Sequence, residues 1–184
     1  MYILIDLIKY FAKFPDRPGV LKLFSRTTER ITGYDTLKNY ITALPAALNP
    51  EIKDFIVSTD ETVVSQRIRN AASFFMLLEY AGLASTAPNR AYIRESAFNL
   101  SVIIAHTNNK PGYDIVEEQL IMDQALETVT KIAKQMEVDN QDMCSNRRFM
   151  PGSVSIQPIE PAMLYGCIGW SLTMTKSEPL FNEA

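Results

Sequence analysis

The clearest periodic pattern in the chain is a stripe of apolar residues between positions 115 and 138. Apolar side chains recur there at spacings of three and four residues, which is the period of one helix face. They are Met122, Ala125, Leu126, Val129, Ile132, Ala133 and Met136. Asp114 is a good N-cap residue, and Glu117 follows three residues later, as in a capping box. The pattern predicts one long amphipathic helix lying on a core.

A two-residue alternation marks two strands. In "AYIRESAFNLSVIIAH" one side carries Phe98, Leu100, Val102 and Ile104, while Asn99 and Ser101 point the other way. In "YGCIGWSLTMT", residues 165–175, one side is apolar (Ile168, Trp170, Leu172 and Met174) and the other is small or mildly polar. "IKDFIVSTD", "ASFFMLLEYAGL" and "SVSIQPI" are further predicted strands, and the second of them also fits a short buried helix. We expect the second of these to pair with "AYIRESAFNLSVIIAH" as an antiparallel hairpin around the turn cluster "ASTAPNR".

The first fifty residues favour helices. Tyr2, Ile5, Ile8 and Tyr10–Phe11 fall near one side of a helix over 2–14, which Pro15 and Pro18 end. The apolar piece "VLKLF", a polar loop "RTTERITGYD" and a short helix in "TLKNYITALPAAL", broken near Pro45, follow. "ETVVSQRIRN" is a further predicted helix, capped within residues 58–61.

These elements predict one domain over residues 1–184, with a helical part at 1–50, an α+β core at 51–176 and a tail at 177–184. The expected fold is α+β: a mostly antiparallel sheet with the long helix packed on one face and a helical N-terminal extension. The polar stretch "VDNQDMCSNRRFMPG" is an expected loop. The apolar side of residues 165–175 should pack on the long helix, which leaves the opposite face uncovered.

Composition narrows the function classes. The formal net charge of −3 is too small to favour nucleic-acid binding. A single histidine and two cysteines, with no C-x-x-C spacing, make a zinc site an unfavourable interpretation. The seven glycines form no phosphate-binding motif, so no cofactor or metal is predicted. No apolar run reaches the ~20 residues of a membrane span, and "MYILIDLIKYFAKF" is expected to be a buried helix of an unexported protein.

Three groups of residues are candidates for a site. His106 with Cys144 or Cys167 could form a nucleophile–base pair, although a strand-end histidine and space-filling cysteines explain them as well. Arg147, Arg148, Phe149 and Met150 have the composition of an interface loop, or of a loop that folds back on the core. Gly166 and Gly169 within the last strand indicate either a bulge or tight packing inside the chain, or close contact with a neighbouring chain.

The order of elements from Phe55 to Thr175, with the closing strand "IGWSLTM", resembles the small tail-terminator and tail-completion (head–tail joining) proteins of tailed bacteriophages. The resemblance implies a non-enzymatic protein that forms a homo-oligomeric, possibly six-fold ring and contacts tail-tube or connector proteins. It implies assembly in the bacterial cytoplasm and then a place in the particle. Gly169, Ser171 and Thr173 would allow close approach of subunits, and Arg147, Arg148, Phe149 and Met150 would reach axial partners.

Two other function classes stay open. A small cysteine-dependent enzyme requires His106 within hydrogen-bonding reach of a cysteine in a cleft. A stand-alone ligand- or peptide-binding domain requires a concave apolar pocket of several hundred Å³. The assembly hypothesis requires oligomers that depend on concentration.

Overall fold

The computed structural model describes residues 3–25, 31–57, 60–71, 73–86, 95–107, 114–141, 154–161 and 164–179. The elements in chain order are α1 (Ile3–Phe11), α2 (Arg17–Leu21), α3 (Tyr34–Thr42), β1 (Asp54–Val57), α4 (Glu61–Asn70), β2 (Phe75–Thr86), β3 (Glu95–His106), α5 (Ile115–Gln141), β4 (Ser155–Pro158) and β5 (Ile168–Pro179). The predicted α+β class is confirmed.

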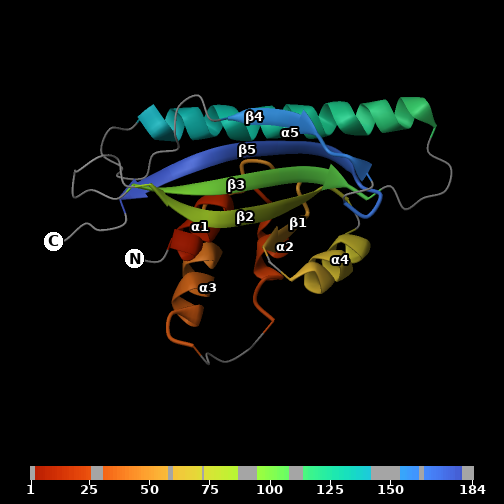
Figure 1. The fold of residues 1–184 in the computed structure, drawn as a ribbon. Helices are drawn as coiled ribbons and strands as arrows, with labels where there is room; N and C mark the ends of the chain where they lie inside the picture. The colour runs from red at the N-terminus through yellow and green to blue at the C-terminus, as the bar shows by residue number, and fades with distance from the viewer. Residues whose placement is uncertain are drawn as a thin grey trace.

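The five strands form one sheet in the order β1-β2-β3-β5-β4. β1 runs parallel to β2, and the other neighbouring pairs are antiparallel, so the predicted β2–β3 hairpin is confirmed. The two outer strands have four residues each, whereas the three inner strands have twelve. Figure 1 shows α5 running along the β5 and β4 side of the sheet, while α1, α2 and α3 gather near β2 and β1.

The long helix has the predicted cap and the predicted buried stripe. The Glu117 backbone N–H donates to Asp114 Oδ1 at 2.8 Å, and Ala125, Val129, Ile132 and Met136 are buried. Trp170 Nε1–H donates to the Met122 carbonyl oxygen at 3.0 Å, and α5 therefore packs on the apolar side of β5 as expected.

The sheet has an apolar core on each face. The first core joins α1–α3 and α5 to one face through residues that include Phe11, Met76 and Val102. The alternate residues, such as Leu77 and Ile103, face the other way and form a second core with α4 and residues 164–167. The expectation that this second face is uncovered is therefore wrong at one end of the sheet, where α4 packs on it.

The last strand begins and ends later than the sequence pattern indicated. β5 starts at Ile168, and Gly166, with φ 79°, lies in a turn in which its N–H donates to the Pro161 carbonyl oxygen at 2.8 Å. The strand continues to Pro179, which pairs with Glu95. Residues 177–179 therefore belong to β5 and not to the expected tail. Backbone pairing with β3 sustains a strand where the side-chain pattern has become polar.

Two other predicted boundaries are wrong. β2 continues to Thr86 because it stays paired with β3, so the cluster "ASTAPNR" begins inside a strand. α5 continues to Gln141, past the expected loop start at Val138. Contacts from α1 to Asp139 extend this helix beyond its apolar stripe.

The N-terminal helices cover the sheet through the predicted side of α1, since Phe11 is buried in the first core and Ile8 and Tyr10 pack against it, and Leu7 joins them. Leu7, Phe11 and Phe14 are buried, whereas Ile5 and Ile8 from the predicted apolar side are half-buried. α2 lies directly against β1, because a Cβ on Gly19 would come within 2.2 Å of the Lys53 carbonyl oxygen. The missing side chain of Gly19 is what allows this close approach of the helix backbone to the strand.

Candidate functional site

The sequence-predicted site residues fall into two groups. Arg147, Arg148, Phe149 and Met150 lie outside the described residues, as does Cys144. Gly169, Ser171 and Thr173 lie in β5 on the face opposite α5. Gly169 is buried, and a Cβ there would come within 2.1 Å of the Ile104 carbonyl oxygen. The absence of its side chain is thus explained by β3 of the same chain rather than by a neighbouring chain.

Ser171 and Thr173 belong to a polar area of the sheet. Register places Glu79, Ser101, Thr173 and Ser155 side by side across four strands, and directly opposed residues share a face. The Ser101 and Ser171 hydroxyl oxygens lie 2.9 Å apart in a hydrogen bond. Partial burial raises the pKa of the Glu79 carboxyl. This part of the second face, beyond the cover of α4, presents hydroxyl groups and one carboxyl group.

His106 and Cys167 point to opposite faces of the sheet. His106 pairs with Ile168, and its ring packs edge-on against Phe74, 5.1 Å between centroids, on the side of the first core. Cys167 belongs to the second core and is buried. Desolvation raises the pKa of the Cys167 thiol to about 11, which disfavours the thiolate that a nucleophile requires. The structure therefore does not bring this cysteine and the histidine together as a catalytic pair.

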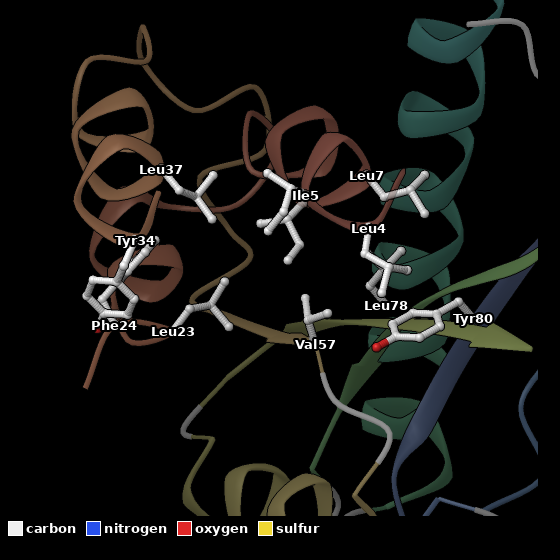
Figure 2. A pocket seen from close by; sticks show the side chains of 11 residues that line it. Leu4, Ile5, Leu7, Leu23, Phe24, Tyr34, Leu37, Val57, Leu78 and Tyr80 are labelled. Atoms are coloured by element: carbon white, nitrogen blue, oxygen red, sulfur yellow. The ribbon is translucent and has the colours of Figure 1, made fainter. Parts of the chain in front are cut away.

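An apolar pocket opens between the N-terminal helices and the sheet (Figure 2). It has a volume of about 380 Å³, and its walls come from α1, α3, the segment after α2, β1 and β2. Leu4, Ile5, Leu23, Leu37, Val57 and Tyr80 are among the side chains that line it. In Figure 2 the Tyr80 hydroxyl points toward Val57 across the pocket. The size lies at the lower end of the range for small-molecule pockets, about 300–1,000 Å³.

The N-terminal turns of α5, residues 114–123, form a second apolar surface that we call the α5 tip. Ile115, Val116 and Leu120 are 79%, 65% and 61% exposed. Figure 1 shows this end of α5 extending beyond the sheet. The charged residues of the tip are all acidic: Asp114, Glu117, Glu118 and Asp123. Ile121 packs against the first core, but the three exposed apolar side chains point away from it, and an exposed apolar cluster ringed by acids is typical of a contact surface.

A second charged surface lies on the outer side of α2, β1 and the end of α4, and we call it the β1 flank. Its charge is positive, whereas that of the α5 tip is negative. Its acids are in ion pairs, Asp54 with Lys22 and Asp16 with Lys53, the latter at 3.2 Å. Arg67 donates to the Lys22 carbonyl oxygen at 2.8 Å, and Arg17 donates to carbonyl oxygens at the end of α3. Since these carbonyls are neutral, the two arginines make the flank positive. The pocket adjoins the flank through Leu23 and Val57.

A polar cluster fixes α1 to the far end of α5. Tyr10 OH donates to Asp139 Oδ2 at 2.6 Å, Lys13 forms an ion pair with the same carboxylate, and Gln135 donates to Oδ1 at 2.8 Å. Desolvation alone would raise the pKa of Asp139, but the hydrogen bonds from these three side chains and the Lys13 charge lower it. Desolvation and the Asp139 carboxylate together raise the pKa of Tyr10.

Three further findings bear on function. Among the described residues, no cluster of three histidine, cysteine or acidic side chains has the geometry of a metal site. The helices in that part of the chain are all too short or too polar to cross a membrane. No known family, curated protein or solved structure matches the chain.

The sequence pattern predicted neither the pocket nor the α5 tip. Val116 and Leu120 fall on another side of the helix than the apolar stripe that begins at Met122, and this offset was the available signal. The pocket had no comparable signal, because it joins segments that are distant in the sequence.

Proposed function

We propose that this protein is a non-enzymatic structural component that assembles into a homo-oligomeric ring, as a tail terminator or head–tail joining protein of a phage or phage-like particle. Its partners would be further copies of itself and the tail-tube or connector proteins. Assembly would take place in the bacterial cytoplasm, before the ring becomes part of the particle. The observation that carries this proposal is the α5 tip.

The tip supports assembly because it is apolar where a helix of a monomer is normally polar. Exposed apolar residues that cluster on one element mark interaction surfaces. Closed rings require heterologous contacts, in which one surface of a subunit meets a different surface of the next. The acidic tip and the positive β1 flank are two such chemically different surfaces.

The separation of His106 from Cys167 favours this function over a cysteine-dependent enzyme using Cys167. The apolar pocket favours one competing function, the binding of a small apolar ligand by a monomeric domain. The oligomeric state in solution distinguishes ligand binding by a monomer from ring assembly.

Light scattering over a concentration series tests the proposed function. We expect the average mass to rise from that of the 20.8 kDa chain toward one limiting oligomer, with rings visible by electron microscopy. A mass that stays at one chain up to millimolar concentration, with an apolar probe bound in the pocket, would establish the competing function instead.

A further inference from the structure

We infer that the α5 tip of one subunit inserts into the apolar pocket of the next, and that this contact closes the ring. The inference rests on the proposed function, because it names the two surfaces that a head-to-tail assembly would use. The occupant of the pocket is thus a second copy of this chain.

The pocket is apolar enough to accept the tip. Its walls include Leu4, Ile5, Leu23, Leu37 and Val57. The side chains offered by the tip are two branched aliphatic residues and a leucine: Ile115, Val116 and Leu120. Burying them against aliphatic walls would remove apolar surface from water on both partners.

Charge favours the same pairing. The first basic residue after the start of α5 is Lys131, so the tip carries Asp114, Glu117, Glu118 and Asp123 without compensation along the helix. On the β1 flank beside the pocket, Lys22 is paired with Asp54, whereas Arg67 donates to a neutral carbonyl oxygen and keeps its charge for a partner. Opposite charges around an apolar contact guide the approach and select the orientation of the partner.

A subunit cannot fill its own pocket with its own tip. α1, which lines the pocket, is fixed to Asp139 at the other end of α5. At 1.5 Å per residue, Asp139 lies about 36 Å along the helix axis from Ile115. Figure 1 likewise shows the N-terminal end of α5 on the opposite side of the molecule from α1 and α3. The two surfaces can therefore meet only between subunits.

Two substitutions block one surface each. Leu120→Asp places a charge on the tip, and its matched control is Val138→Asp, because Val138 is 59% exposed on the same helix. Leu4→Asp places a charge at the pocket, where Leu4 is 41% exposed, with Leu48→Asp as the control at an exposed position outside the pocket lining. Thermal melts followed by circular dichroism identify any variant that fails to fold, and Leu4→Gln then replaces Leu4→Asp.

Sedimentation velocity of each variant alone and of a mixture tests the inference. We expect each blocking variant alone to need at least tenfold higher concentration to associate, while the controls stay within twofold of the wild type. The mixture of the two blocked variants should form dimers but no rings, because one intact tip meets one intact pocket.

Three outcomes would overturn the inference. If Leu4→Asp associates like the wild type while Leu120→Asp does not, the tip docks elsewhere, and ring assembly itself still stands. If the mixture stays monomeric while each control associates, the two surfaces are not partners. A wild-type chain that is monomeric throughout would remove both this inference and the proposed function.

Discussion

At Gly169 the absence of a side chain is required by the sheet itself. A Cβ would come within 2.1 Å of the Ile104 carbonyl oxygen and 2.6 Å of the Ala105 Cα, both in the neighbouring strand β3. Backbone atoms of a central strand cannot move aside as the end of a flexible side chain can. The strands β3 and β5 would have to separate locally to admit a methyl group.

We therefore expect Gly169→Ala to lower the free energy of unfolding by about 3 kcal/mol, the upper end of overpacking costs. Thr173→Val is the control, since Thr173 is exposed on the same face of β5 and loses only a long hydrogen bond, 3.4 Å, to the Ser155 carbonyl oxygen. It should change stability by less than about 0.5 kcal/mol. Urea denaturation measures both, and equal effects would show that the close approach at Gly169 is unimportant.

The Asp139 carboxylate is the centre of the polar cluster between α1 and α5. We expect Asp139→Asn to lower the free energy of unfolding at pH 7 by about 1–2 kcal/mol, through weaker hydrogen bonds and the lost ion pair with Lys13. Because the folded-state pKa of Asp139 is lowered, the ionised carboxylate contributes its full stabilisation above the unfolded value of about 3.9.

This contribution is lost as the pH falls through the folded-state pKa of Asp139. The stability difference between wild type and Asp139→Asn should therefore be constant near neutral pH and shrink below about pH 4. Glu137→Gln, at an exposed position two residues away, controls for the general effect of removing a charge from α5. A difference between wild type and Asp139→Asn that does not depend on pH would contradict the role given to the carboxylate.

At the scale of elements, α5 owes its place on the sheet to its buried stripe. Val129 is fully buried and Val138 is mostly exposed on the same helix, so they form a matched pair. We expect Val129→Ala to cost about 2 kcal/mol through lost burial and a cavity. Val138→Ala should be neutral or slightly stabilising, because alanine has the higher helix propensity. Thermal denaturation compares them, and similar losses would mean that α5 is not anchored by its stripe.

The elements with strong local signals were predictable from the sequence. Asp114 and the stripe from Met122 to Met136 defined α5, and the alternation from Phe98 to Ile104 defined β3. The end of α5 at Gln141 was not predictable, because it depends on Asp139 meeting Tyr10, 129 positions away. The extension of β5 to Pro179 likewise depends on backbone pairing with Glu95 rather than on side-chain periodicity.

The candidate site was less predictable than the fold. Alternation in β5 correctly put Ser171 and Thr173 on the face opposite α5. It could not show that α4 covers part of that face, because this contact forms between distant segments. The pocket arises in the same way, from α1, α3 and β1 meeting in space.

For the whole molecule, the acidic α5 tip and the positive β1 flank imply that self-association depends on ionic strength. Raising NaCl from about 0.05 to 0.5 M shortens the Debye length from roughly 14 to 4 Å and screens the attraction between the two surfaces. We expect the association constant to fall by at least threefold, as measured by sedimentation equilibrium. Association that strengthens with salt would indicate a purely apolar contact.

We propose above all that the chain assembles head to tail into a closed ring. Native mass spectrometry tests it most directly, because it resolves every oligomer present by mass. We expect one dominant closed species, six copies of the 20.8 kDa chain for a six-fold ring, with few intermediates at high concentration. A spectrum of monomers alone, or of dimers that grow no further, would contradict it.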